Sequence, residues 1–271
     1  MTTSPSEKDS PSWASAGRGR KPPVGEAVIT RAFRLLQSFD SDHRALSLAD
    51  LARRAAMPRS SALRLARTLV EAGALERRKD GIFVVAVRLL EIASLAPRGH
   101  GLREVAMPFM EDLFYVTRQH VLLAVRDGDE ALLVERLSAH DASQVRFRVG
   151  GGMPLTSTGV GMVLLAHAPA DEQERLVRRF VAVEGESLAS SEADLRRSLA
   201  EVRRGGYAIA QRDEPDRLST IAAPVRNLEG VVAALSVVVP SAGFTPGTYV
   251  AAVRTSARAI SRELGANGPT S

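Results

Sequence analysis

Two short segments near the N-terminus repeat apolar residues at helical spacing, with a tight break between them. Every third or fourth residue is apolar in residues 48–55, and the same spacing continues in residues 59–72 beyond Pro58. Ser47 suits the N-cap of the first helix, because Asp50 three positions later nearly completes a capping box. Pro58 suits the first turn of the second helix, where its missing N–H would have no partner. The pattern predicts a helix-turn-helix.

A predicted hairpin follows the second helix. Residues 74–76 and 82–85 are extended segments joined by a basic turn that ends in Asp80-Gly81, a dipeptide that favours tight turns. With helices expected at residues 28–38 and 87–95, this segment has the organisation of a winged helix-turn-helix. The expected divisions of the chain are a low-complexity basic tail predicted to be disordered (1–25), the winged helix-turn-helix (26–85), a linker helix with a hinge at Pro97–Gly101 (86–101), and a second domain (102–266).

The second half of the chain alternates helical and extended segments. Turn residues at Asp127-Gly128-Asp129 and at Asn227–Gly230 each lie between two apolar runs, which predicts two antiparallel hairpins. Hairpins with helices gathered outside them predict an α+β sandwich with an antiparallel sheet. The expected helices are 102–117, 159–168, 171–181, 191–204 and 246–264, and the expected strands are 121–125, 131–137, 145–149, 207–210, 219–225 and 231–239.

Composition narrows the classes of function. The 271 residues are enough for two domains of ordinary size, and the absence of cysteine excludes disulfides, thiolate nucleophiles and cysteine-ligated zinc. Five histidines stand singly, without the spacing that suits a metal, so we expect no metal site and no cofactor. No apolar run is long enough for a membrane span, and the first 25 residues lack the apolar core of a secretory signal. We therefore expect a cytoplasmic protein without a membrane partner.

Positive charge is concentrated in the first part of the chain. Residues 1–98 hold 17 Lys or Arg against 10 Asp or Glu, whereas residues 99–271 hold 19 against 21. The net charges are +7 and −2, which give the +5 of the whole chain. Such an excess attracts nucleic-acid phosphates, because neutralising them releases condensed counterions. Within the tail, Arg18-Gly19-Arg20 resembles minor-groove-binding tails, and a solubilising tail is the alternative interpretation.

The second helix of a helix-turn-helix lies in the major groove of double-stranded DNA, and the first helix braces it. Arginine can bind guanine bidentately and short hydroxyls can reach bases or phosphates. Contacts to phosphates set the register of the protein and not the sequence it reads, and the pattern does not decide which arginine reads a base. The predicted groove-facing residues are Arg59, Ser60, Ser61, Arg64 and Arg67, and the further predicted DNA contacts, mainly to phosphates, are Ser47, Arg53, Arg54, Arg77, Arg78 and Lys79.

A set of short motifs recurs in order along the chain. A helix-turn-helix alone is unspecific, whereas this ordered set resembles the IclR-type transcriptional regulators over about residues 26–265. The motifs are Arg31-Ala-Phe-Arg-Leu-Leu36, Ser47-Leu-Ala-Asp-Leu-Ala52, Pro58-Arg-Ser-Ser61, Arg67-Thr-Leu-Val-Glu-Ala-Gly73, Arg88-Leu-Leu-Glu91, Gly152-Met-Pro-Leu155 with Gly161, Arg204-Gly-Gly-Tyr207, and Ile221-Ala-Ala-Pro-Val225 with Gly230 and Ala233-Ala-Leu-Ser236.

The resemblance implies a transcriptional regulator, expected to be a repressor. It implies a homodimer or a dimer of dimers, held partly through the DNA-binding domains and the linker helix, so the operator would be roughly palindromic. It also implies that the second domain is a GAF-like α/β sandwich with an antiparallel sheet. This domain would bind a small molecule and thereby shift the affinity for the operator.

The resemblance also carries an effector pocket onto this chain, with several departures. A frequent histidine of the pocket loop is Thr156 here, an acidic position falls on Ala210, and a frequent cysteine is Thr220. Polar pocket groups fix the orientation of a ligand, and several are apolar in this chain. We expect an effector larger and less polar than a two- or three-carbon acid, such as an aromatic acid or a lactone. The implied effector residues are Met153, Leu155, Thr156, Ser157, Gly159, Val160, Ala210, Leu218, Thr220, Ser236 and Val238.

Two other classes of function stay open. An architectural or effector-independent DNA-binding protein with a degenerate pocket is one of them. An enzyme fused to a DNA-binding domain is the less favoured one, because Ser157 and Ser236 have no evident histidine partner. Gly150-Gly-Gly152 also lacks the lysine and hydroxyl of a phosphate-binding loop. We therefore predict no catalytic residues.

Overall fold

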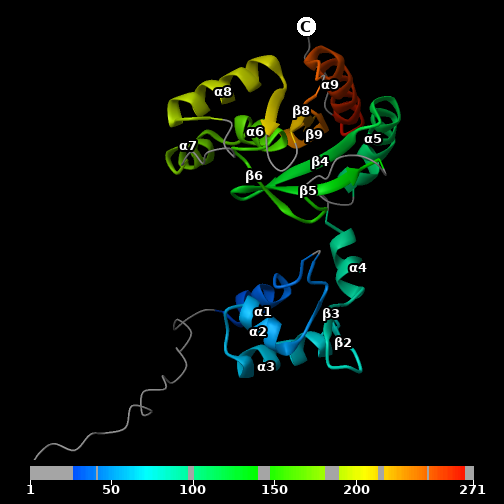
Figure 1. Cartoon of the computed structure of the whole chain (residues 1–271), viewed down its shortest axis with the longest axis vertical. Coiled ribbons are helices and arrows are strands. Elements are labelled where there is room, and N and C mark those ends of the chain that lie inside the picture. Colours follow the sequence, from blue (N-terminus) through cyan, green and yellow to red (C-terminus); the bar gives the residue numbers. More distant parts are fainter. Residues whose placement is uncertain are drawn as a thin grey trace, which may run out of the picture. The chain divides into compact units, whose positions relative to one another are not determined.

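The computed structural model describes residues 27–40, 42–96, 101–139, 147–180, 189–212, 217–242 and 244–265 (Figure 1). The predicted tail (1–25) and most of the predicted hinge, residues 97–100, lie outside the described residues. The chain divides into two compact units, Met1–Ile92 and Ala93–Ser271, and each is described by itself.

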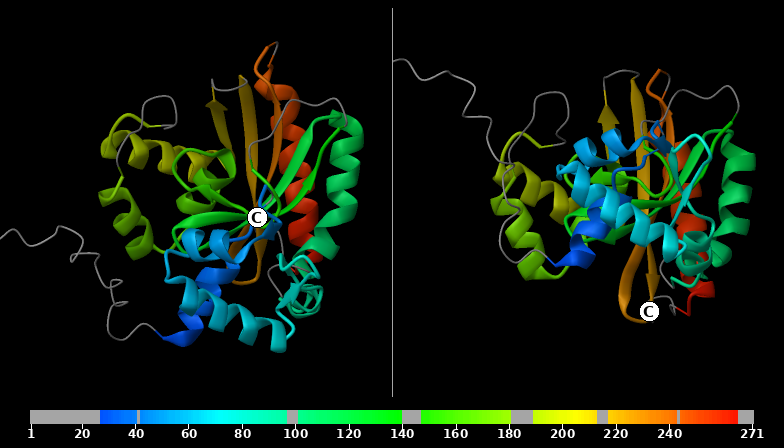
Figure 2. Two further views of the ribbon diagram at one scale, coloured as in Figure 1. Left: turned by 60° about the horizontal axis from the view of Figure 1, so that its bottom comes forward. Right: turned by 90° about the horizontal axis from the view of Figure 1, so that it is seen from below.

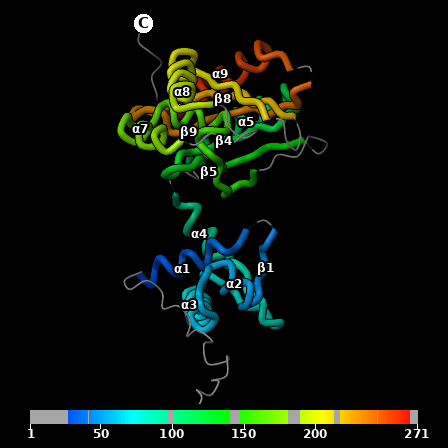
Figure 3. Tube along the Cα trace, turned by 60° about the vertical axis from the view of Figure 1, so that its left-hand side comes forward, coloured from blue at the N-terminus to red at the C-terminus, as the bar shows by residue number. Residues whose placement is uncertain are grey.

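The first unit has the predicted winged helix-turn-helix fold. Its three strands form a sheet in the order β1-β3-β2, with antiparallel pairs. Helices α1, α2 and α3 pack on one another, and their arrangement is visible in Figure 3. The elements are α1 (Val28–Leu36), β1 (Ala45–Leu46), α2 (Leu48–Arg54), α3 (Arg59–Glu71), β2 (Leu75–Arg77), β3 (Phe83–Val85) and α4 (Arg88–Ser94), whose last two residues belong to the second unit.

Local signals set the ends of the elements in this unit. The Ser47 hydroxyl accepts a hydrogen bond of 3.2 Å from the Asp50 N–H and caps α2 as expected. Pro58 was expected inside the first turn of α3 but occupies the N-cap position, with φ −58° and ψ 141°, so the helix begins at Arg59. The ring of proline fixes φ and leaves ψ free, so the proline can serve either position. The turn of the wing closes at Gly81, where φ is +84°.

A six-stranded antiparallel sheet forms the centre of the second unit, in the order β6-β5-β4-β9-β8-β7. This confirms the predicted α+β class with an antiparallel sheet. The helices of this unit are α5 (Leu102–Thr117), α6 (Gly159–Ala166), α7 (Ala170–Arg178), α8 (Glu192–Gly205) and α9 (Pro246–Glu263), and its strands are β4 (His120–Asp127), β5 (Glu130–Leu137), β6 (Gly152–Pro154), β7 (Ala208–Arg212), β8 (Leu218–Asn227) and β9 (Gly230–Pro240).

Helices cover both faces of this sheet, so each face has its own apolar core. Helices α5 and α9 pack on one face, and α6, α7 and α8 lie on the other (Figure 2). Alternate residues of β9 divide between the two cores: Leu235 and Val237 face α5 and α9, while Ala234 and Val238 face α6. Burial on both faces explains why β9 is an almost continuous apolar run and not an alternating one.

One predicted strand is wrong over its described part. Residues 147–149 of the expected strand 145–149 are not extended strand, and residues 145 and 146 lie outside the described residues. The chain turns at Gly150, where φ is +76°, and the Gly150 N–H donates to the Leu133 carbonyl at 2.8 Å. On the edge of β5 opposite β4, the partner strand is instead β6, with Met153 opposite Ala131. The other predicted elements occur where they were expected, with ends shifted by a few residues, and the short strand β1 was not predicted.

Candidate nucleic-acid interface and ligand pocket

One side of α3 is buried and the other carries arginine. Ala62, Leu65 and Ala66 are almost completely buried against the core of the first unit. This packing fixes the rotation of the helix, so the residues between them face outward. The exposed guanidinium groups of Arg59, Arg64 and Arg67, here called the α3 arginines, form no ion pair or side-chain hydrogen bond with any described residue. Ser60 is exposed beside them, and Ser61 is half-buried.

The predicted contacts of α2 are engaged within the unit itself. Ser47 donates a hydrogen bond of 2.7 Å to the Asp50 carboxylate, and Arg53 pairs with the same carboxylate at 2.5 Å. The Ser47 hydrogen bond and then the Arg53 charge hold the pKa of Asp50 below its ordinary value. The guanidinium of Arg54 donates from Nε to the Ser38 carbonyl at 2.7 Å and pairs with Asp40, and only 28% of its side chain is exposed.

The basic turn of the wing likewise contains one side chain that contacts its own unit and two that do not. The Arg77 guanidinium lies over the ring of Phe83, 5.6 Å from its centroid. Arg78 and Lys79 are exposed at the tip, and no described residue pairs with either charge. The α3 arginines, Arg78 and Lys79 are therefore the cations of this unit's predicted interface that have neither an ion pair nor an aromatic contact with a described residue.

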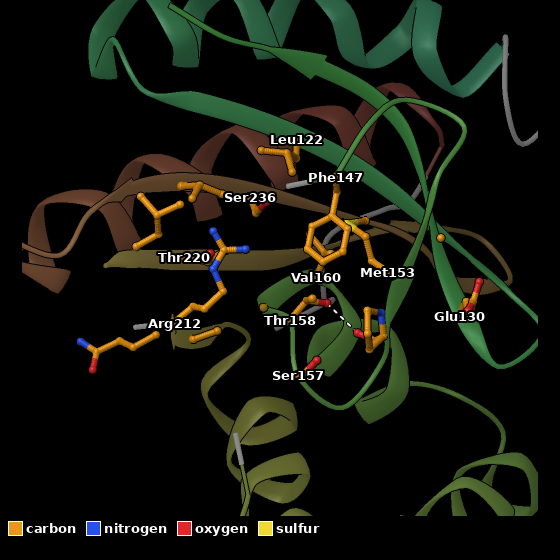
Figure 4. Close-up of a pocket in the computed structure, with 17 residues that line it drawn as sticks. Leu122, Glu130, Phe147, Met153, Ser157, Thr158, Val160, Arg212, Thr220 and Ser236 are labelled. Carbon is orange, nitrogen blue, oxygen red and sulfur yellow. Dashed lines mark hydrogen bonds between the residues drawn. The ribbon is translucent and has the colours of Figure 1, made fainter. Parts of the chain in front are cut away.

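A cavity of about 450 Å³ opens on the α6 side of the sheet in the second unit (Figure 4). All of the predicted effector residues except Leu155 and Thr156 line it. Leu155 is buried in the apolar core, and Thr156 lies half-buried in the turn before α6. The lining residues are Leu122, Glu130, Phe147, Gly152, Met153, Pro154, Ser157, Thr158, Gly159, Val160, Ala210, Gln211, Arg212, Leu218, Thr220, Ser236 and Val238.

The strand register builds the floor of this cavity. Thr220 of β8 lies opposite Ala210 of β7 and Val238 of β9, so these three side chains form one row. Side chains two residues apart on a strand share a face. Arg212, two residues beyond Ala210, and Ser236, two residues before Val238, therefore join the same floor. Arg212, Thr220 and Ser236 thus cross β7, β8 and β9 as a polar diagonal.

The N-terminal end of α6 forms one wall. The Thr158 hydroxyl caps this helix by accepting from the Gly161 N–H at 3.0 Å, and it donates to the Pro154 carbonyl at 2.8 Å (Figure 4). Glycine at two positions permits this close packing. A Cβ at Gly159 would lie 2.8 Å from the Thr220 methyl group, and a Cβ at Gly161 would lie 2.5 Å from the Pro154 carbonyl oxygen.

Two further features define the chemistry of the wall. Phe147 stands beside Met153, and its carbonyl accepts a hydrogen bond of 2.8 Å from the Arg136 guanidinium (Figure 4). The Ser236 hydroxyl is completely buried, and it has no hydrogen-bond partner among the described residues. A buried hydroxyl without a partner is costly, and a bound ligand can remove that cost. The cavity therefore offers apolar contact area with a few polar groups placed on it.

Several residues that line the pocket were not predicted from the sequence. Alternation along the strands could have found Arg212 from Ala210, because both lie on the pocket face of β7. Phe147 gave no usable signal, because it falls in the segment wrongly expected to be a strand. Leu122 and Glu130 become pocket residues only through the pairing of β4 with β9 and of β5 with β6.

No group of three or more His, Asp or Glu side chains in the described ranges could hold a metal ion. Among the described helices, none is both long enough and apolar enough to span a membrane.

Comparison with known proteins gives consistent matches for both units. Residues 28–79 match the IclR helix-turn-helix domain family, and residues 96–262 match the family described as bacterial transcriptional regulator IclR C-terminal. The chain is 28% identical over 251 residues to the HTH-type transcriptional repressor AllR of Klebsiella pneumoniae, covering 89% of this chain and 91% of that protein. It is also 28% identical to the glycerol operon regulatory protein of Streptomyces coelicolor, with 88% of this chain and 96% of that protein covered.

A solved structure is similar over nearly the whole chain. It is an IclR homolog from Microbacterium hydrocarbonoxydans complexed with 4-hydroxybenzoate. Its sequence is 36% identical, the TM-score is 0.80, and the match covers 89% of this chain and 100% of that one. A second IclR homolog, from Microbacterium sp. strain HM58-2, is 34% identical with a TM-score of 0.56 and covers 90% of this chain.

Proposed function

The chain belongs to the IclR family of transcriptional regulators, and from this we propose that it is a repressor whose affinity for its operator is set by a small organic acid in the pocket of the second unit. The observation that carries the DNA-binding part is the exposed face of α3, where three guanidinium groups have no counter-charge among the described residues. DNA phosphates and the edges of guanine bases supply the missing partners.

The residue roles follow from which side chains are already engaged. We assign the major groove to the α3 arginines with Ser60 and Ser61, and phosphate contacts to Arg78 and Lys79. Arg54 is held by Ser38 and Asp40, so its role in this proposal is to fix α2 against the loop after α1. Ser47 and Arg53, both joined to Asp50, support α2 in the same way.

The pocket supports a ligand with an apolar body. Its volume of about 450 Å³ is within the range of small-molecule sites. Phe147, Met153, Leu122 and Val238 provide apolar contact, which suits a ring better than a two- or three-carbon acid. The relative from Microbacterium hydrocarbonoxydans was crystallised in complex with 4-hydroxybenzoate, which is an aromatic acid. We therefore propose an aromatic or similarly ring-bearing acid as the effector.

Exposed apolar residues on two helices support association with a second copy. Ile29 and Phe33 of α1 are 71% and 60% exposed, and Leu90 and Ile92 of α4 are 68% and 61% exposed. Apolar side chains in such number on short helices are typical of a contact surface. We propose a homodimer, or a dimer of dimers, on a roughly palindromic operator in the cytoplasm.

Footprinting of the purified full chain on genomic DNA tests the regulator directly. We expect a few protected sites with two-fold symmetry, and the neighbouring genes would name the pathway. A fragment carrying one site is then titrated with 4-hydroxybenzoate and related ring acids, and we expect saturable release of the protein from the DNA. Protection without preference for any site would contradict a specific regulator. Specific binding that no small acid changes would favour the effector-independent alternative.

A further inference from the structure

A charged side chain lies in the floor of the ligand pocket. Arg212 is the last residue of β7, and it shares a face with Ala208 and Ala210, which are both buried. Figure 4 shows its side chain reaching into the pocket near Thr220 and Ser236. The Nε and one terminal nitrogen of the guanidinium are shielded from solvent.

The Arg212 guanidinium lies among floor residues that carry no charge. Neighbouring floor residues are apolar or carry only a hydroxyl, and a cation is costly in such surroundings unless anionic or polar groups meet it. Arg212 makes interactions within the chain. A guanidinium has five N–H donors, so it can keep such an interaction and still bind a carboxylate through two parallel hydrogen bonds. Its planar fork matches the two oxygens of a carboxylate, which a lysine cannot reproduce.

We propose that Arg212 is the residue that selects the charge of the effector, by pairing with the carboxylate of a ring-bearing monocarboxylic acid. This inference rests on the proposed effector function of the pocket. Thr220 lies next along the polar diagonal, near the guanidinium (Figure 4). The ring of the acid then lies against Phe147 and Met153, which stand over the middle of the pocket (Figure 4).

The opposite side of the pocket carries the other sign of charge. Glu130 lies across the pocket from Arg212, beside Gly152 (Figure 4). A ligand is oriented by this pair of charges, with its carboxylate toward β7 and any hydroxyl toward Glu130. A second carboxylate at the far end of the ring would be repelled there. The class of ligand is therefore narrowed from ring acids in general to monocarboxylates.

Calorimetry on the full-length protein tests the role of Arg212. The probes are 4-hydroxybenzoate and its neutral analogue 4-hydroxybenzamide, which has the same ring without the charge. We expect the wild-type protein to bind the acid roughly 10- to 100-fold more tightly than the amide, because a charge-assisted bidentate pair is lost with the amide. Arg212→Gln should bind both probes equally weakly, and Arg212→Lys should recover part of the preference for the acid.

A matched variant separates this role from a general effect of charge. Arg204 is exposed on α8 and does not line the pocket, so Arg204→Gln removes the same charge and should bind like the wild type. The ratio of acid to amide affinity is the decisive readout, because a merely structural loss in Arg212→Gln would weaken both probes and leave the ratio unchanged.

The outcomes distinguish this inference from the function on which it rests. Equal binding of acid and amide by the wild type, or an unchanged ratio in Arg212→Gln, overturns the role of Arg212 and leaves a ligand-binding pocket in place. Binding of neither probe by the wild type overturns the ring-acid effector and this inference together. Footprinting still decides in that case whether the protein is a DNA-binding regulator.

Discussion

Arginine is used in opposite ways on α3 of the first unit and on α7 and α8 of the second. The α3 arginines of the first unit have no counter-charge among the described residues. On α7 and α8 of the second unit, by contrast, arginines are joined to acidic residues of the same surface. Arg196 pairs with Glu174 at 2.9 Å and with Glu192 at 3.1 Å, and Arg178 pairs with Glu174 at 2.8 Å.

The comparison shows that the number of basic residues on a surface does not by itself determine how strongly that surface attracts DNA. Exposed ion pairs contribute little to stability, but they supply a local counter-charge that a phosphate would have to displace. The surface of α7 and α8 therefore offers little net attraction to DNA despite its many arginines. On α3 no described residue supplies a counter-charge, and we propose that a nucleic acid provides it.

Neutralising the α3 arginines should have the largest effect on operator binding, and neutralising the ion-paired arginines of α7 and α8 should have little effect. Replacing the α3 arginines together by glutamine should weaken operator binding by at least about 100-fold, since each lost base contact costs about 1–3 kcal/mol. The slope of log affinity against log salt should also fall by roughly 1 for each phosphate contact removed. Fluorescence anisotropy with the footprinted fragment at several salt concentrations measures both quantities.

The control for this experiment is charge-matched. Arg178, Arg196 and Arg197 of the second unit, replaced together by glutamine, remove the same three charges from ion-paired positions. Operator affinity and its salt dependence should change little. Equal losses in the two triple variants would show that total charge, and not the uncompensated face of α3, determines binding.

The two units also differ in how far the sequence predicts them. The first is governed by local signals: a capping serine, a break at Pro58 and a tight turn at Gly81. Each of these acts within a few residues, so the pattern predicts the elements and the outward face of α3. The pattern cannot show which outward arginines form ion pairs with residues distant in the sequence. Arg54, for example, pairs with Asp40, which lies 14 positions earlier.

The pocket depends on contacts between distant strands. Motifs carried over from the family predict the loop before α6 and the row through Thr220, because these positions keep their spacing along the chain. Arg212 and Glu130 become neighbours of the same cavity only through the order β6-β5-β4-β9-β8-β7. Cross-strand register is not encoded in the period of a single strand, so Glu130, unlike Arg212, could not be found from the pattern alone.

A buried glycine of α6, behind the pocket wall, allows a test in the second unit. A Cβ at Gly161 would lie 2.5 Å from the Pro154 carbonyl oxygen and 2.6 Å from the Leu155 Cα, so the backbone has to move. Gly161→Ala should cost about 1–3 kcal/mol of stability through overpacking and should displace the cap of α6. We expect 4-hydroxybenzoate binding to be lost in calorimetry while ligand-free operator binding persists.

The matched control is a glycine with free space around it. No atom within 4 Å would meet a Cβ at Gly247 of α9, so Gly247→Ala should leave ligand binding unchanged. Loss of operator affinity in Gly161→Ala without ligand would contradict the assignment of this segment to effector binding alone.

The hydroxyl groups that cap α2 and α6 allow one test in each unit, with a smaller expected effect. Ser47 caps α2 and Thr158 caps α6, with acceptor distances of 3.2 and 3.0 Å. Ser47→Ala and Thr158→Ala should each cost about 1 kcal/mol of stability, the usual value for a lost cap. Urea unfolding measures this cost. Ser47→Ala should then weaken operator binding alone, whereas Thr158→Ala should weaken 4-hydroxybenzoate binding. An effect of both variants on the same ligand would contradict the division of roles.

The smallest expected effect concerns acid pH and Arg54, an ion-paired arginine of the first unit. The Asp40 carboxylate accepts from the His43 ring at 2.8 Å and also pairs with Arg54. The His43 hydrogen bond is the main cause that lowers the pKa of Asp40 from 3.8 to about 2. A lowered pKa in the folded state stabilises the fold above pH 4, and this contribution is lost as the pH falls toward 2.

Asp40→Asn should therefore flatten part of the acid dependence of stability. Asparagine cannot ionise, so the urea midpoint of the variant, followed by circular dichroism, should fall less between pH 4 and pH 2 than that of the wild type. Asp129 of the second unit gives the parallel case, because its hydrogen bond with Arg175 also lowers its pKa. Asp129→Asn should act in the same direction. Only Asp40→Asn should also weaken operator binding, since Asp40 pairs with Arg54 and so helps to fix α2 against the loop after α1. If both variants bound the operator like the wild type, the supporting role assigned to Arg54 would be wrong.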